Sequence, residues 1–112
     1  MDTAFAQEAS YIREVGHLSY RDIARATGAG VSTVGAWMRC TRVPTGDRAE
    51  RLAELSAAVE RLARVMEPAY IPVWLHKPVG ALDDGKPIDV LAQGQYRLIS
   101  RLISELESPV FS

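Results

Sequence analysis

The sequence predicts an all-α protein in which an N-terminal helix-turn-helix is joined by a long helix to a small helical module. Apolar residues recur at spacings of three and four along most of the chain, as they do on one face of a helix. Glycine or proline ends each of these stretches, and no segment shows the alternation of a strand. With 112 residues, 47% of them hydrophobic and 24% charged, the chain has the size and composition of a globular protein.

The first module is assigned to residues 1–46. Three helices are predicted in it, over residues 5–15, 20–27 and 31–40. Gly16 ends the first helix, and Gly28 ends the second. Ser19 and Asp22 have a spacing close to that of a capping box, which marks the start of the second helix.

A long helix is predicted over residues 47–66, within a connecting segment at 47–67. Asp47 and Glu50 are expected to cap its start, and Pro68 stops the chain from continuing it. Its apolar positions form a narrow seam, made of Leu52, Leu55, Val59, Leu62 and Met66. We favour packing of this seam against the chain's own N-terminal helices. Pairing with a second copy is the alternative, although two heptads are too few to establish a coiled coil.

The second module is assigned to residues 68–112. Helices are expected over residues 69–76, 88–92 and 95–107, and the last carries an apolar face of Leu98, Ile99, Leu102, Ile103 and Leu106. Proline and glycine punctuate the stretch at 78–87. Pro109 prevents the last helix from continuing, so Val110, Phe111 and Ser112 form a short tail.

The segment from Tyr20 to Trp37 carries the strongest local pattern. A helix-turn-helix needs a small residue where its two helices cross, which Ala24 supplies, and a turn at positive φ, which Gly28 supplies. Gly30 stands at the N-cap of the third helix, where serine or threonine would cap more strongly. The pattern predicts that the third helix is the recognition helix of a DNA-binding motif.

This recognition helix offers few side chains that read bases. Those expected to face the major groove are Val31, Ser32, Thr33, Gly35 and Ala36, and none of them makes a bidentate contact to a base. Arg21, Arg39 and Arg42 flank the motif and are expected to contact phosphates. Six arginines outnumber three acidic residues between positions 20 and 51, although the net charge of the chain is only −1. We therefore expect recognition through backbone geometry and DNA shape; the alternative is a structural three-helix unit that contacts no DNA.

Several other classes of function are disfavoured. Cys40 is the only cysteine, so no disulfide forms within the chain and a cytoplasmic location is expected. No apolar run reaches the roughly 20 residues of a membrane span, and the N-terminus lacks the layout of a signal peptide. His17 and His76 have no partners at metal-ligand spacing, and Asp83, Asp84 and Asp89 near Lys86 are interpreted as a solvated turn. Since no phosphate loop or nucleophile motif is present, we expect no enzymatic activity, metal or cofactor.

Taken as a whole, the sequence resembles the Xre/MbcA/ParS family of antitoxins. In the first half the resemblance rests on Trp37, Pro44 and the segment 51–55, which opens the long helix. In the second half it rests on a succession of short pieces: Val73-Trp74-Leu75, Pro78, Ala81-Leu82, Gly85-Lys86-Pro87, Asp89, Leu91, Gly94 and the ending 107–111. These pieces follow the family's order over nearly the whole chain, and their succession is more specific than any one of them.

The resemblance implies that the chain is the antitoxin of a type II toxin–antitoxin pair. Its first half would be an Xre-like helix-turn-helix that represses its own operon, and its second half a toxin-binding domain. The partner would be a RES-domain toxin that degrades NAD and is inhibited when the antitoxin covers its active site. Candidate toxin-binding residues are Trp74, Lys86, Tyr96, Val110, Phe111 and Ser112.

Alternatives to these assignments remain open. Trp74 and Tyr96 are better explained as core anchors of the second module than as ligand-stacking residues, and their partial exposure would count toward a partner surface. Phe111 is equally well explained as a side chain that folds back onto its own module. Pro109 stands where the family commonly has glycine, so the tail is expected to be stiffer. The whole chain could also be a stand-alone DNA-binding regulator, or an interaction module without DNA binding. We expect a homodimer, because operators are usually two-fold, and a hetero-oligomer with the toxin; no contact with a membrane is expected.

Overall fold

The computed structural model describes residues 4–108, and this part of the chain is all-α, as predicted. The helices are α1 (Ala4–Glu14), α2 (Tyr20–Thr27), α3 (Val31–Met38), α4 (Gly46–Leu62), α5 (Ile71–Leu75), α6 (Pro87–Ala92) and α7 (Tyr96–Glu107). Two short 3₁₀ helices, η1 (Pro68–Tyr70) and η2 (Gly80–Leu82), lie on either side of α5. A single antiparallel bridge joins Val79 and Gly85 in the described chain. None of the described helices is long and apolar enough to cross a membrane.

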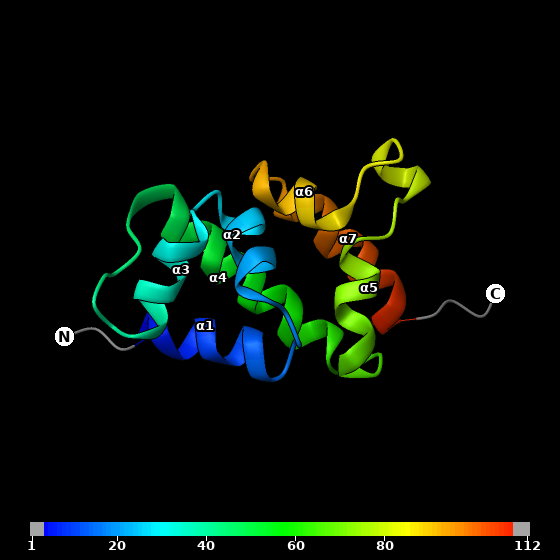
Figure 1. Ribbon diagram of the computed structural model, residues 1–112. Coiled ribbons are helices and arrows are strands. Elements are labelled where there is room, and N and C mark those ends of the chain that lie inside the picture. The colour runs from blue at the N-terminus through cyan, green and yellow to red at the C-terminus, as the bar shows by residue number, and fades with distance from the viewer. Residues whose placement is uncertain (1–3, 109–112) are drawn as a thin grey trace.

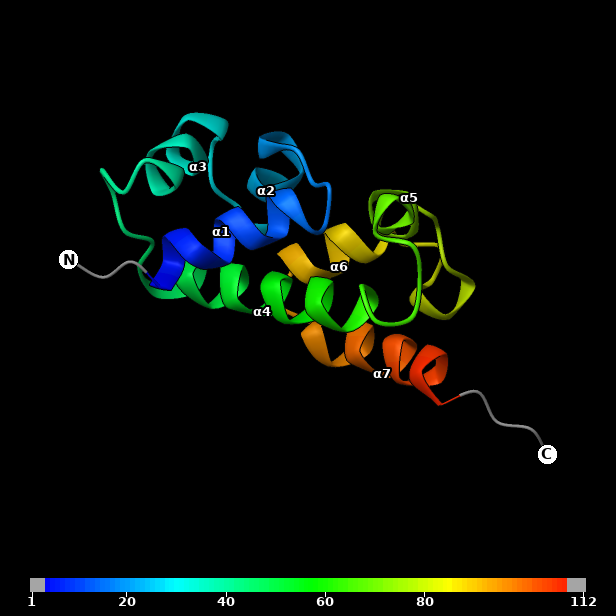
Figure 2. The ribbon, with the colours of Figure 1, turned by 90° about the horizontal axis from the view of Figure 1, so that it is seen from below.

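Helix α4 forms the axis of the molecule. Figures 1 and 2 show α1, α2 and α3 along one side of it and α7 along the other, and α6 packs against α2, α4 and α7. The molecule is elongated, with extents of 50 × 25 × 20 Å, and α3 lies at the end away from α5 and η2. The two ends are therefore free to contact different partners.

The start and the end of α2 are as predicted from local residues. The Ser19 Oγ accepts a hydrogen bond from the backbone N–H of Asp22 at 3.0 Å, and the Asp22 carboxylate accepts one from the Ser19 N–H at 3.5 Å. The two bonds make a capping box, which satisfies N–H groups that have no partner within the helix. Gly28 ends the helix in the left-handed region at φ 77°. Ala24 is buried in the core cluster.

The boundaries of α4 differ from the prediction. Thr45 is the N-cap residue, in an extended conformation and without a side-chain capping bond, so Asp47 and Glu50 do not cap the helix. Asp47 instead lies in the first turn, where its charge favours the helix dipole. The helix ends at Leu62, four residues before Met66. The N–H groups of Arg64 and Val65 bond to carbonyls three residues back, and these tighter turns end the helix before Pro68 is reached.

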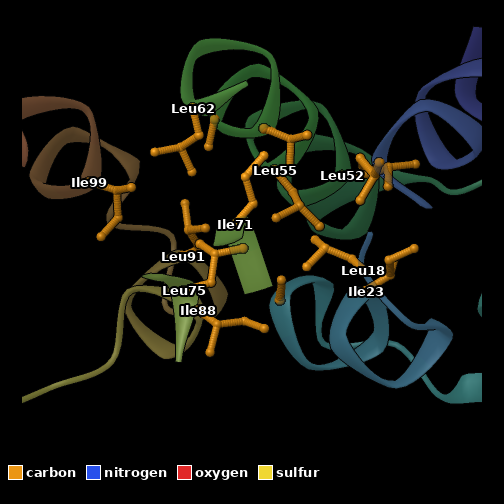
Figure 3. Close-up of a cluster of buried hydrophobic side chains, with 14 of the residues drawn as sticks. Leu18, Ile23, Leu52, Leu55, Leu62, Ile71, Leu75, Ile88, Leu91 and Ile99 are labelled. Atoms are coloured by element: carbon orange, nitrogen blue, oxygen red, sulfur yellow. The ribbon is translucent and has the colours of Figure 1, made fainter. Parts of the chain in front are cut away.

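The seam of α4 is part of one continuous core. Leu52, Leu55, Val59 and Leu62 are fully buried, and they pack in one cluster with side chains from both halves of the chain. Figure 3 shows Leu18 and Ile23 of the first half, and Ile71, Leu75, Ile88 and Leu91 of the second half, gathered around α4. These four residues therefore pack within the chain, as favoured, and leave no free surface for a second copy. Met66, the fifth residue of the predicted seam, lies beyond the end of α4 and is half-buried against the same core. The core crosses the boundaries near residues 46 and 67 without a break.

Candidate functional site

The surface of α3 that faces solvent is limited to its first turn. Val31 is 48% exposed, Ser32 is exposed and Thr33 is half-buried. Gly35 and Ala36, which were expected to face a DNA groove, are both buried, and Ala36 is only 6% exposed. The expectation for these two residues is wrong, and the surface that could read bases reduces to Val31, Ser32 and Thr33.

Two neighbouring segments cover the second turn of α3. The guanidinium of Arg39 lies over Gly35, where a Cβ would be 3.1 Å from Arg39 Nη1 and 3.7 Å from the Tyr20 ring. The carbonyl of Ala36 accepts hydrogen bonds from the Thr41 N–H at 3.0 Å and from the Thr41 hydroxyl at 3.2 Å. These bonds hold the loop after α3 against the end of the helix. Neither contact could be read from helical periodicity alone.

The predicted phosphate-contacting side chains are accessible. Arg21, Arg39 and Arg42 are all exposed, and no ion pair engages them within residues 4–108. Arg13 is a further cation of this region that the sequence did not single out. Its guanidinium lies 4.7 Å from the centre of the Tyr20 ring, and its Nη1 donates to the Leu18 carbonyl at 3.4 Å. Since Arg13 and Tyr20 belong to different helices, only the fold brings them together.

Two polar bridges tie the second half of the chain to α2. Arg25 donates two hydrogen bonds to the Asp89 carboxylate, at 2.6 Å and 2.8 Å, and this pairing raises the pKa of Arg25. The Nε2 of His76 lies 2.8 Å from Oδ1 of Asp22. Asp83 and Asp84 are exposed turn residues, as interpreted from the sequence, but Asp89 is not part of a solvated turn. The bridges connect residues 64 and 54 positions apart, so no local pattern predicts them.

The predicted toxin-binding residues within the described part of the chain are all half-buried. Trp74 packs against the core cluster, and the Tyr96 hydroxyl accepts a hydrogen bond from Arg61 Nη1 at 3.4 Å. Lys86 is the N-cap residue of α6, and its carbonyl accepts from the N–H groups of Asp89 and Val90. Each of the three has a structural role and also some free surface. Val110, Phe111 and Ser112 lie outside the described residues.

Arg61 connects α4 to α7 through several hydrogen bonds. It donates to both oxygens of Glu107, at 2.7 Å and 2.9 Å, and to the hydroxyls of Ser100 and Ser104, at 2.7 Å and 3.0 Å. The hydrogen bonds from Arg61 lower the pKa of Glu107 below its ordinary value of 4.5, and those to Glu107 and Tyr96 raise the pKa of Arg61. One guanidinium therefore contacts three successive turns of α7 and sets its position on α4.

Replacing Glu107 with glutamine is expected to change how stability depends on pH. A carboxyl whose pKa is lower in the folded state stabilises the fold above the unfolded-state value, and this stabilisation disappears as pH falls through the folded value. The variant should be less stable than the wild type at neutral pH and should lose less stability on acidification to about pH 3. Urea midpoints at the two pH values measure this. Glu105→Gln, the same change at an exposed position of α7, is the control, and an equal response of both variants would contradict the role of Arg61.

Large apolar side chains are exposed on the elements of the second half. Tyr70 and Val73 lie on η1 and α5, and Leu98 and Leu106 lie on α7. Leu98 also borders a hollow of about 380 Å³ between η2 and the start of α7. Single exposed apolar residues are ordinary, but aromatic and aliphatic surface on three elements of one small module suits contact with another protein. Within the described chain no group of three or more histidine, cysteine or acidic side chains could hold a metal ion.

The comparisons with known proteins agree over nearly the whole chain. The mycobacterial cidal antitoxin MbcA of Mycobacterium tuberculosis, and that of Mycobacterium bovis, are 29% identical to it over 94 residues, which cover 84% of this chain and 83% of those proteins. One chain in the crystal structure of the Mycobacterium tuberculosis MbcT–MbcA toxin–antitoxin complex superposes with a TM-score of 0.85 at 28% identity, covering 97% of this chain and 98% of that one. No protein-family model matches the sequence.

By these matches the chain is a homologue of antitoxins, a class of protein that is not enzymatic. Within that class the chain is an MbcA-type antitoxin homologue, which confirms the family resemblance seen in the sequence. Its fold is accordingly MbcA-like over both halves.

Proposed function

We propose that this protein is an antitoxin that binds a cognate MbcT-like toxin and neutralises it. The observation that carries the proposal is the match to one chain of a toxin–antitoxin complex, because it spans 97% of this chain, including the second half. A likeness limited to α1–α4 would equally suit any regulator with a helix-turn-helix. The stand-alone regulator is therefore the weaker alternative.

The toxin-binding surface is proposed to lie on the second half, on the side chains of Trp74, Lys86 and Tyr96 and on the tail at Val110, Phe111 and Ser112. The exposed surface of Tyr70, Val73 and Leu106 supports this assignment, since these apolar groups are 40–53% exposed among residues 4–108. From the family resemblance, we further propose that the toxin is a RES-domain enzyme that degrades NAD in the cytoplasm. The tail would then cover the entrance of its active site.

Co-expression tests this proposal directly. The toxin encoded by the neighbouring gene should arrest growth when expressed alone, and the full chain should restore growth and co-purify with it. A chain lacking residues 109–112 should still bind the toxin but should protect cells less well. Complete protection by the truncated chain would show that the tail is not needed to neutralise the toxin. Failure of the full chain to bind or protect would leave the regulator hypothesis as the better one.

DNA binding and repression of its own operon are proposed as the second activity. Ser32 at the outer side of α3, together with the exposed Arg21, Arg39 and Arg42, supports this proposal because a short reading surface is bordered by unpaired cations. The chain should bind a duplex from upstream of its own gene, with an affinity that falls steeply with salt. Dimerisation on such a site would use surfaces other than the buried seam of α4.

A further inference from the structure

Two open hollows border the exposed turn of α3. The first, here called the Arg13 hollow, has a volume of about 440 Å³ and is lined by Arg13, Ser19, Tyr20, Arg21 and Val31. The second, here called the Arg48 hollow, has a volume of about 70 Å³, and its polar lining consists of Thr33, Arg42, Thr45 and Arg48. Each hollow thus combines two arginines from different segments with at least one hydroxyl group.

The hollows lie on opposite sides of α3. The Arg13 hollow reaches the helix at Val31, and the Arg48 hollow reaches it at Thr33. Because successive side chains of an α-helix are about 100° apart, positions 31 and 33 point about 160° away from each other. Ser32 lies between them and is exposed, while Val34 and Trp37 face the core. The exposed turn is therefore flanked by positive charge on both sides.

The chemistry of the Arg13 hollow suits a phosphate group. The contacts of Arg13 with the Tyr20 ring and the Leu18 carbonyl hold the guanidinium in place and leave other N–H donors free. The Ser19 oxygen accepts from the Asp22 N–H, so its hydroxyl hydrogen remains available for donation. Arg21 extends from the first turn of α2. Two charged groups and one neutral donor therefore converge on one space.

The Arg48 hollow is built in a similar way from later parts of the chain. Arg42 comes from the loop after α3, and Arg48 from the first turn of α4. Thr45 makes no capping hydrogen bond with its side chain, so its hydroxyl is not committed to the start of α4. Neither Arg13 nor Arg48 forms an ion pair among the residues that the structure describes.

We propose that the two hollows hold phosphates of the two DNA strands that border one major groove, with Arg13 and Arg48 as phosphate contacts that sequence patterns did not reveal. A helix with its side chains is about 10–12 Å wide, and the major groove is about 12 Å wide, so a helix in the groove has one backbone on each side. This arrangement also compensates for the short reading surface, because phosphate contacts fix the register of the protein on the duplex. The inference rests on the proposed DNA binding and specifies its geometry.

The dependence of duplex affinity on salt tests the assignment. Each lost phosphate contact reduces the magnitude of the negative slope of log K against log salt by about 1. Arg13→Gln and Arg48→Gln should therefore each reduce this magnitude by about 1, and the double variant by about 2. The probes are a duplex from upstream of the gene and an unrelated duplex of equal length, and both should respond equally. Arg13→Lys and Arg48→Lys should keep most of the slope. Arg101→Gln, which removes an exposed arginine from α7, is the control and should leave it unchanged.

The possible outcomes separate this inference from the function on which it rests. If the wild type binds duplex DNA and its slope is the same in the glutamine variants, the two hollows are not phosphate sites, although DNA binding stands. If the wild type binds neither duplex, both proposals fail. If Arg13 and Arg48 are required for binding to anionic lipid vesicles or to free phosphate but not to duplex, the occupant proposed here is wrong. Circular dichroism and urea midpoints equal to those of the wild type exclude unfolding as the cause of a changed slope.

Discussion

Replacing Leu55 with alanine is expected to lower the free energy of unfolding by about 2–5 kcal/mol, the usual cost of emptying a fully buried leucine site. Leu55 has no exposed surface and lies on α4 within the cluster that joins both halves of the chain (Figure 3). Because the cavity opens in a shared core, the two halves should lose stability together. The expected result is one cooperative transition, with its midpoint shifted by the same amount in each half.

The two tryptophans allow this to be measured in each half separately. Trp37 reports on the first half and Trp74 on the second, so Leu55→Ala is compared with the parent in a Trp74→Phe and in a Trp37→Phe background. Leu106→Ala, at a position that is 40% exposed, is the matched control and should cost less than about 1 kcal/mol. A midpoint shift seen by only one tryptophan would mean that the halves unfold as independent domains.

Replacing Gly16 with alanine is expected to be similarly damaging, at about 1–3 kcal/mol or more, because the site is already filled. A Cβ at this position would lie 2.6 Å from the Ile12 carbonyl oxygen and 2.8 Å from Cγ1 of the buried Val59. One of these groups is backbone and the other is enclosed by the core, so neither moves aside at low cost. The added methyl group should force α1 away from α4.

Urea unfolding of Gly16→Ala measures this cost, with Gly80→Ala as the control. Gly80 has no neighbour within 4 Å of a Cβ and its φ is not positive, so the same substitution there should change stability by less than about 0.5 kcal/mol. Wild-type stability of Gly16→Ala would show that the chain around residue 16 relaxes without loss. It would also show that the fold does not require the close approach of α1 and α4.

Local features of the sequence predicted local features of the fold. The capping box of Ser19 and Asp22 and the left-handed Gly28 were predictable because each depends on residues within one turn. The start of α4 was not, since Thr45, Asp47 and Glu50 are all acceptable near a helix start and the preceding loop decides which residue is the cap. The end of α4 was placed four residues too late, because apolar spacing continues into turns that no longer follow the helix.

On the candidate DNA surface, too, the sequence predicted some features and missed others. Exposure of Val31, Ser32, Arg21 and Arg42 follows from their places on a helix-turn-helix. The burial of Gly35 and Ala36 does not, since it depends on how α3 packs in the fold and not on its own periodicity. Arg13 was not singled out, and Arg48 contributed only to the local excess of arginines, because a lone arginine on a helix can be assigned a role only when the neighbouring segments are known.

The sequence by itself determined that the chain is helical, where most helices begin and end, and which antitoxin family it resembles. These properties depend on residue types at short spacings along the chain, and such spacings can be read directly. Only the tertiary structure decided that α4 buries its seam within the chain, that Asp89 and His76 bind α2, and that two basic hollows flank α3. Each of these depends on contacts between segments far apart in sequence, and helical periodicity specifies which face of a helix is buried but not what lies against it.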